Sequence, residues 1–276
     1  MKRIVDILLK TSRWKVQLGM LMVLNASFIP WLNPWLKRIP CTTLHCHACP
    51  AATFACPIGS LQNSGTLRAA PFYVLGILGI TGVLVGRLSC GWFCPFGFLQ
   101  DQLHRIKTPK FEFNYNIGWI RYAVLILLVG IVPIITNELW FCKLCPAGTL
   151  EAGIPRVITE DHVRSQIGWF FGLTIVMLAA LLGAMIVIKR PFCRFVCPLG
   201  AIYSPFNRHS VMQLEVDHQS CIKCGQCQDV CPVDIDITED ANSYECIRCL
   251  ECAKVCPVSA IGYRETKLGE VEKTGV

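Results

Sequence analysis

Two cysteine runs near the end of the chain constrain its fold most strongly. CIKCGQCQDVCP begins at Cys221 and CIRCLECAKVCP begins at Cys246, and both follow the spacing C-x2-C-x2-C-x3-C-P. In such runs three closely spaced thiolates bind one cubane iron–sulfur cluster, and the fourth crosses to the other cluster. The predicted ligands are Cys221, Cys224, Cys227 and Cys256 for cluster 1, and Cys246, Cys249, Cys252 and Cys231 for cluster 2. Zinc is the weaker interpretation, because tetrahedral zinc sites do not explain the prolines after the crossing cysteines.

The composition indicates a membrane protein. Of the 276 residues, 53% are hydrophobic and 16% are charged, whereas soluble domains carry about 25% charged residues. Most of the eighteen cysteines lie in C-x2-C or C-x3-C steps, which favour metal ligation over a disulfide framework. The net charge of +7 comes from basic residues spread beside apolar stretches, so it indicates membrane topology rather than nucleic-acid binding.

Four apolar stretches are long enough, at about 18 residues or more, to cross a bilayer core about 30 Å thick. They cover residues 16–36, 71–88, 117–135 and 167–188. Thirteen Lys and Arg residues flank one side of these predicted spans and six flank the other. This imbalance predicts a multi-pass protein of the cytoplasmic (inner) membrane with both termini in the cytoplasm. The predicted fold is all-α, with four transmembrane helices as two tandem helix-pair repeats, plus a small C-terminal α+β module.

The predicted division of the chain follows these features. Residues 1–210 form the transmembrane domain, with one repeat at about 14–105 and the other at about 117–205. Residues 211–263 form the dicluster ferredoxin-type domain. Residues 264–276 are charged and lack aromatic side chains, which predicts a disordered tail.

In this topology the other cysteine motifs lie at helix ends. CGWFCPFGF and CRFVCPLGA place Cys90, Cys94, Cys193 and Cys197 on the cytoplasmic side. Because a cubane needs four thiolates, these four predict an inner cluster at the membrane face. The alternative, small buried hydrophobes at helix ends, is disfavoured by the repeated cysteine–proline pair.

The phrases CHACPAATF and CKLCPAGTL lie on the outer side and predict an outer-face cluster held by Cys46, Cys49, Cys142 and Cys145. Cys41 and Cys56 have no counterparts in the second phrase and leave alternatives open. Cys41, Cys46, Cys49 and Cys56 could hold a cluster alone, because C-x4-C-x2-C resembles plant-type spacing. Cys41 and Cys56 could instead form a disulfide, or all six cysteines could share a larger site.

The histidines and a few charged residues bear on two other cofactors, haem and quinone. Haem is not expected, because all six histidines lie outside the predicted spans and C-x4-C-H is an expanded form of the attachment motif. Asp101, His104 and Arg105 are candidates to hydrogen-bond a quinone and move its protons, with a solvated helix face as the alternative. Arg121 is a fourth quinone candidate, and its alternatives are snorkelling to lipid headgroups or a place beside the inner cluster.

The segment CGWFCPFGFLQD, the second C-x3-C-P and the twin C-terminal runs together resemble the membrane polyferredoxin family. That family includes the quinol dehydrogenase subunit of periplasmic nitrate reduction and the membrane regulator of nitrous-oxide respiration. The resemblance covers residues 70–260 and implies four helices, cytoplasmic clusters, and electron exchange between the quinone pool and a partner. The outer cysteines are not part of the family's shared core.

These features predict an electron-transfer subunit of an oxidoreductase rather than a complete enzyme. The expected partners are membrane lipid, other subunits of a redox complex, a cytoplasmic electron carrier or dehydrogenase, and an extracytoplasmic redox protein, with no nucleic acid. The alternative is an assembly factor or a copper-reducing factor of the same family. Because a bilayer core about 30 Å thick is too wide for one efficient electron hop, inner and outer clusters would have to sit at membrane depth or be bridged.

Overall fold

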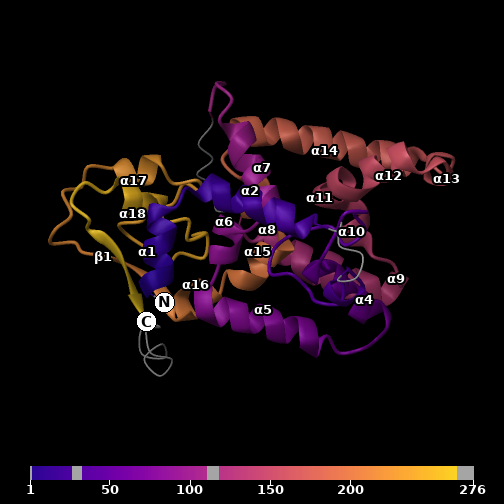
Figure 1. The fold of residues 1–276 in the computed structure, drawn as a ribbon, viewed down its shortest axis with the longest axis horizontal. Helices are drawn as coiled ribbons and strands as arrows, with labels where there is room; N and C mark the ends of the chain where they lie inside the picture. Colours follow the sequence, from indigo (N-terminus) through magenta and orange to yellow (C-terminus); the bar gives the residue numbers. More distant parts are fainter. Residues whose placement is uncertain (1, 27–32, 111–117, 266–276) are drawn as a thin grey trace.

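The computed structural model describes residues 2–26, 33–110 and 118–265. These residues form a largely helical body with the C-terminal module at one end (Figure 1). The N-terminal helices are α1 (Lys2–Lys10), α2 (Arg13–Leu24) and α3 (Asn33–Leu36). Short helices lie around the cysteine motifs: α4 (Pro57–Thr66), α6 (Leu88–Trp92), α7 (Pro95–His104), α10 (Trp140–Leu144), α11 (Pro146–Gly148), the π-helical η2 (Thr149–Gly153) and η3 (Phe192–Val196), α12 (Ile154–Thr159), α13 (Asp161–Arg164), α15 (Pro198–Tyr203) and α16 (Phe206–His209).

Three apolar helices frame this body. They are α5 (Phe72–Val85), the continuous run α8 (Ile120–Val124), η1 (Leu125–Ile131) and α9 (Val132–Thr136), and α14 (Trp169–Val187). In Figure 1, α14 and α5 lie on opposite sides, and the short cysteine-bearing helices lie between them.

The prediction of four transmembrane helices in tandem pairs is wrong. Among the described residues only α14, with 19 residues, is long and apolar enough to cross a membrane. Residues 71–88 yield the 14-residue α5, because the chain turns at Gly86, where φ is +57°. At 1.5 Å per residue such a helix reaches about 21 Å, which is short of a core about 30 Å thick. The third stretch yields a shorter apolar helix, Ile120–Thr136, and the first is divided between α2 and α3, with part of it outside the described residues.

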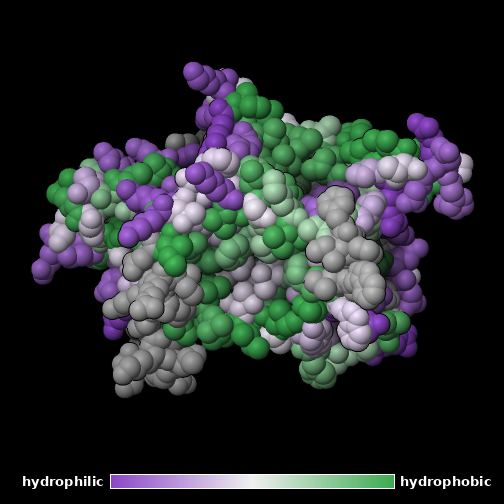
Figure 2. Space-filling view, in the orientation of Figure 1, coloured by the Kyte–Doolittle hydropathy of each residue, from purple (hydrophilic) through white to green (hydrophobic). Residues whose placement is uncertain are grey.

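The three apolar helices expose hydrophobic side chains on the outside of the body. The most exposed include Phe72 on α5, Ile135 on α9 and Trp169 on α14, at 79%, 73% and 80%. Figure 2 shows hydrophobic surface along both α14 and α5. Extended apolar surface of this kind indicates contact with lipid or another protein.

The hydrophobic core joins the helices to the C-terminal module. Leu78 of α5, Met185 of α14 and Leu199 of α15 pack in one cluster with Val233 and Ile247 of the module, and this cluster includes cysteines from every motif region. Most of the cysteine loops are therefore built into the core, whereas Cys224 is exposed.

The module is closed by a two-stranded sheet. Strand β1 (Met212–Val216) pairs antiparallel with β2 (Ile261–Glu265), and α17 (Gln226–Asp229) and α18 (Glu251–Val255) lie in the two cysteine runs. Helix α1 packs on the module through Val5 and Leu8. Strand β2 includes two residues of the predicted tail, and residues 266–276 lie outside the described residues, so the domain boundaries stay a prediction.

Candidate iron–sulfur centres

Four cysteines in the sequence Cys-Pro-x-Gly share one local structure. Each is the residue before a helix, with extended φ and ψ, and the proline occupies the first helical turn, where its missing N–H is tolerated. The motifs are CPIG before α4, CPFG before α7, CPAG before α11 and CPLG before α15, headed by Cys56, Cys94, Cys145 and Cys197. Burial raises the pKa of each of these thiols, and the nearby amide of the glycine three residues later opposes that rise. In the Cys56 cap this amide, from Gly59, donates to the sulfur at 3.5 Å.

The structure brings the four predicted inner ligands together. Cys90, Cys94, Cys193 and Cys197 are all buried, with 5–6% exposure. Besides burial, the negative charge of Cys193 and Cys90 raises the pKa of both Cys94 and Cys197, so the four sulfurs share one electrostatic environment. Gln100 Nε2 lies 3.0 Å from Cys193 Sγ and donates to it. We call this group the helix-end site.

Two buried arginines cross between the halves of the helix-end site. Arg87 lies three residues before Cys90 and donates to the carbonyl of Cys193 at 3.2 Å. Arg190 lies three residues before Cys193 and donates to the carbonyl of Cys90, also at 3.2 Å. Both side chains are 1% exposed. Each guanidinium fills the space left by the glycine of a cap, since a Cβ would lie 3.3 Å from Arg190 at Gly97 and 3.1 Å from Arg87 at Gly200.

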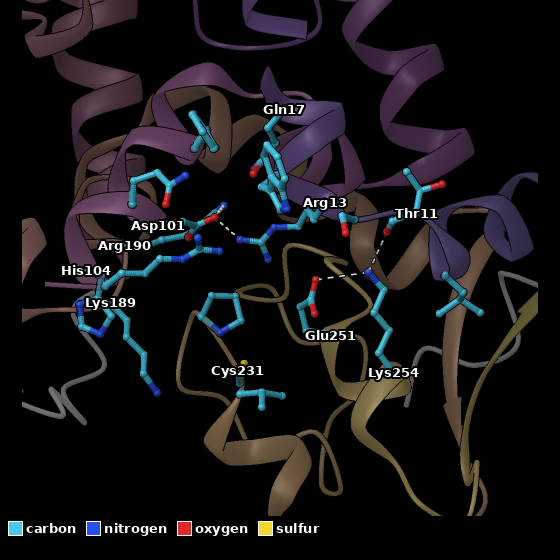
Figure 3. A pocket seen from close by; sticks show the side chains of 18 of the residues that line it. Thr11, Arg13, Gln17, Asp101, His104, Lys189, Arg190, Cys231, Glu251 and Lys254 are labelled. Carbon is cyan, nitrogen blue, oxygen red and sulfur yellow. Dashed lines mark hydrogen bonds and ion pairs between the residues drawn. The ribbon is translucent and has the colours of Figure 1, made fainter. Parts of the chain in front are cut away.

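Asp101 holds one of these arginines. Its carboxylate accepts from Arg190 Nε at 2.7 Å and Nη2 at 2.6 Å, and it also pairs with Arg13 (Figure 3). Burial disfavours the charged carboxylate, but the two guanidiniums outweigh that cost and hold the pKa of Asp101 below its usual range. Asp101 is therefore a fixed anion that positions Arg190.

Three of the four predicted quinone residues line one cavity of about 520 Å³ (Figure 3). They are Asp101, His104 and Arg105, and the cavity also reaches Cys231 and Lys254. Burial lowers the pKa of His104. Quinone binding at this cavity stays a prediction.

Arg121 lies elsewhere. Its side chain is 1% exposed, and it donates to Glu245 at 2.5 Å and to Ser204 Oγ at 2.8 Å. The expectation that it snorkels to lipid headgroups is therefore not met, and the side chain instead ties α8 to the module.

The two ferredoxin sites differ in exposure. Cys231, Cys246, Cys249 and Cys252 are buried, and after burial it is the charge of Cys249, Cys246 and Cys231 that raises the pKa of Cys252. In the other set, Cys224 is exposed and Cys221, Cys227 and Cys256 are half-buried. One site therefore faces inward and the other faces outward.

The buried ferredoxin site lies directly against the helix-end site. Gly91 is between Cys90 and Cys94, and a Cβ at Gly91 would lie 2.4 Å from the carbonyl oxygen of Ile247 and 3.4 Å from the backbone of Cys249. Arg248 in the same loop is fully buried and donates to Ser210 Oγ at 2.6 Å. The two cysteine loops thus touch backbone to backbone.

On the opposite side of the body, the outer cysteines that share one cavity differ from the predicted set of Cys46, Cys49, Cys142 and Cys145. Cys46, Cys142 and Cys145 line a cavity of about 1040 Å³, and the fourth cysteine on it is Cys56 rather than Cys49. Cys49 Sγ lies 3.7 Å from Asn25 Oδ1 and packs with Ala52 and Ala152. Cys41 Sγ donates to the carbonyl of Thr43 at 2.9 Å and does not line the cavity.

The number of thiols in these sets suits cubane clusters. In the described part of the chain no three His, Cys, Asp or Glu side chains converge on a single-ion site. The helix-end site and each ferredoxin set offer four thiols, the number that a [4Fe-4S] cluster requires.

Sequence reasoning missed the roles of Arg87 and Arg190 and of the two glutamines near the sulfurs, Gln62 and Gln100, and it named Cys56 only as an alternative ligand. The signals were present as R-x2-C-x3-C-P-x-G at 87–97 and 190–200, and as C-P-x-G-x-L-Q at 56–62 and 94–100. Both patterns recur with fixed spacing around cysteines, and fixed spacing is what a rigid ligand loop demands.

Two family models match the chain. One, described as a 4Fe-4S binding domain, matches residues 69–114 and 170–215, and so includes all four cysteines of the helix-end site. The other, described as a 4Fe-4S dicluster domain, matches residues 213–257. Neither match reaches the cysteines on the outer cavity.

Several proteins are similar over most of the chain. The protein MJ0750 of Methanocaldococcus jannaschii is 30% identical over 181 residues, which are 62% of this chain and 69% of that protein. The ferredoxin-type protein NapH of Escherichia coli is 26% identical over 217 residues, 74% of this chain and 68% of NapH. The regulatory protein NosR of Stutzerimonas stutzeri is 27% identical over 172 residues, 58% of this chain and 22% of NosR. No solved structure matches the chain.

Proposed function

The chain belongs to the 4Fe-4S polyferredoxin family of NapH and NosR type, whose clusters serve electron transfer, and from this premise we propose that it is a membrane-bound electron-transfer subunit. It moves electrons between a donor or acceptor at the ferredoxin module and a redox partner on the opposite side of the membrane. When bound, [4Fe-4S] clusters supply one-electron chemistry over a wide range of potentials. The chain works within a complex that contains other redox subunits.

The observation that carries this proposal is the backbone contact between the two buried sites. Gly91 of the helix-end loop lies against Ile247 and Cys249 of the module. Two arginines reinforce the contact, since Arg87 donates to the carbonyl of Tyr244 at 2.7 Å and Arg121 pairs with Glu245. This docking holds the two thiolate sets at a fixed separation, which electron transfer between them requires.

The exposed end of the path lies in the module. Cys224 is exposed and its three partners are half-buried, so this ferredoxin site is accessible to a soluble carrier or a second subunit. The other ferredoxin site and the helix-end site are enclosed. The solvent exposure of the cysteines therefore decreases from the outward-facing ferredoxin site to the helix-end site, as expected if electrons enter or leave the protein at the module.

Helix α15 extends the path toward the outer cysteines. It begins after Cys197 and ends at Tyr203, whose hydroxyl donates to the carbonyl of Thr42 at 3.1 Å. Six helical residues rise about 9 Å, far less than a bilayer core about 30 Å thick. A fully buried aromatic side chain thus fills the short gap between the helix-end site and the outer loop.

The membrane location rests on surface and charge. The exposed apolar side chains of α5, η1, α9 and α14 face lipid in this proposal, and α14 crosses the bilayer. The basic residues near the N-terminus, after α7 and at Lys189 and Arg208 support a cytoplasmic position for the module.

Protein groups around the helix-end site favour its reduced state. Arg87 and Arg190 are buried cations beside the thiolates, and a buried cation stabilises added negative charge. Gln100 donates a further hydrogen bond to Cys193. These donors raise the reduction potential of whatever cluster the four thiolates hold.

A double variant tests the proposal. We expect Cys94→Ser with Cys197→Ser to lose about four irons per chain, one cubane, while the electron paramagnetic resonance signals of the two module clusters remain. In liposomes, electron flow from a membrane-impermeant reductant on the module side to an acceptor on the other side should stop. Unchanged iron content, or electron flow that persists after loss of the iron, would contradict the proposed path.

A further inference from the structure

We propose that Cys46, Cys56, Cys142 and Cys145 bind an additional [4Fe-4S] cluster on the wall of the 1040 Å³ cavity. This site lies around α4, α10 and α11, on the side of the body away from the module (Figure 1). The inference rests on the proposed function for the type of cofactor, and on independent geometry for the ligands.

The first argument is the equivalence of two loops. CPIGSLQ at 56–62 and CPFGFLQ at 94–100 have the same cysteine, proline, glycine, leucine and glutamine at the same spacing. In the helix-end site, Gln100 Nε2 donates to Cys193, the first cysteine of the second loop. On the outer side, Gln62 Nε2 donates to Cys142, again the first cysteine of the second loop, at 3.6 Å. In the outer loops, Cys56 therefore corresponds to Cys94 of the helix-end site. Cys145 likewise corresponds to Cys197.

The second argument is that the two outer loops interlock. A Cβ on Gly59, beside Cys56, would lie 3.6 Å from Cys142 Sγ and 4.0 Å from Cys56 Sγ. A Cβ on Gly148, beside Cys145, would lie 3.6 Å from Cys46 Sγ. Each cap glycine thus faces a sulfur of the other loop. The four cysteines line one cavity although they come from two segments about a hundred residues apart.

A buried histidine beside these sulfurs supplies independent evidence for a ligand. His45 is fully buried and lines the cavity, and its Nδ1 lies 3.1 Å from Glu151 Oε2. The same carboxylate oxygen accepts from the Cys46 amide at 2.7 Å. Neither ring nitrogen of His45 makes a hydrogen bond among the described residues, and Nε2 also has no ion-pair partner there. A buried polar atom without a partner is costly, and a bound group in the cavity would satisfy it.

The remaining outer cysteines lie next to this set but make other contacts. Cys49 faces Asn25 and Cys41 donates to the carbonyl of Thr43. Neither lines the cavity. The structure therefore favours a ligand set that takes one cysteine from CHACP, one from CPIG and two from CKLCP.

The test compares two cysteines of the same segment in the full-length protein, purified anaerobically. We expect the unaltered chain to contain about sixteen irons and as many sulfides, from four cubanes. Cys56→Ser should reduce this to about twelve, and Cys142→Ser, from the other segment, should do the same. Cys49→Ser, the matched control seven residues away, should keep the full content. In each variant, the resonance signals of the module clusters report whether the protein is folded.

Each other pattern overturns the ligand assignment. Loss of iron with Cys49→Ser points to a different set of outer ligands. A content of about twelve irons in the unaltered chain, unchanged by Cys56→Ser, means that the outer cysteines hold no cluster. Failure of the proposed function would look different, because then Cys94→Ser with Cys197→Ser would leave iron content or electron flow unaltered.

Discussion

Arg190→Gln is expected to destabilise the protein by about 3 kcal/mol, near the lower end of the range for breaking a buried ion pair. Arg190 is 1% exposed and makes two hydrogen bonds to Asp101 and one to the carbonyl of Cys90. The lower end applies because Arg13 still pairs with Asp101 after the change. The measurement is the midpoint of thermal or denaturant unfolding of the detergent-solubilised protein. Unfolding is monitored by the absorbance of the clusters under anaerobic conditions.

The same substitution should lower the reduction potential of the helix-end cluster. Arg190 carries a positive charge beside the loop of Cys90 and Cys193, and its removal leaves the reduced, more negative state less stabilised. A redox titration should show a lower midpoint potential for the resonance signal of the helix-end cluster and unchanged potentials for the signals of the module clusters. An unchanged potential would mean that Arg190 serves only to hold the two loops together.

Arg208→Gln provides the matched control. Arg208 pairs with Asp240 at 2.8 Å, but the two side chains are 48% and 42% exposed. Exposed pairs contribute about 0–1 kcal/mol, so this variant should show little change in stability and none in potential. A loss equal to that of Arg190→Gln would remove burial as the explanation.

The ion pair of Asp101 and Arg190 also predicts that the stability of the protein depends on pH in the acid range. The pKa of Asp101 is held below its usual range, because the guanidiniums outweigh burial. A carboxyl whose folded pKa is depressed contributes stability above its unfolded pKa, and this contribution is lost as the pH falls through the folded value. The native protein should therefore lose stability below about pH 3.9. Asp101→Asn should be less sensitive to acid in that range, and it should be less stable than the native protein at neutral pH.

Local spacing explains what the sequence could predict. The ferredoxin ligands and the four cysteines of the helix-end site follow from patterns of a few residues, and the structure groups the inner four and the buried ferredoxin set. The outer set was predicted by matching CHACP to CKLCP, which selected Cys49. The structure instead matches CPIG to CPAG, because the residue that begins the helix, and not the first C-x2-C, is what the fold repeats.

The prediction of four membrane-spanning helices failed for a different reason. Hydropathy measures how many apolar residues follow one another, but a helix ends where the backbone turns, as it does at Gly86. The count of basic residues also included Arg87 and Arg190 as topology signals. Their side chains are buried against the cysteine loops, so they act on the site rather than at the lipid surface. Tertiary contacts of this kind are not visible in composition or local pattern.

Gly91→Ala is expected to separate the module from the helix-end site. The added methyl would lie 2.4 Å from the carbonyl oxygen of Ile247, and neither side can retreat, because both belong to the backbone of a cysteine loop. Overpacking costs about 1–3 kcal/mol, which corresponds to a shift of roughly 5- to 150-fold in the docking equilibrium.

Single-turnover kinetics can measure this effect of Gly91→Ala. After rapid reduction of the module, electron arrival at the helix-end site should slow by a comparable factor, while the iron content stays unchanged. Gly79→Ala is the matched control, because no atom lies within 4 Å of its added methyl, so its transfer rate should equal that of the native chain. If Gly91→Ala transfers electrons at the native rate with the same iron content, the contact of these loops is not the route between the two sites.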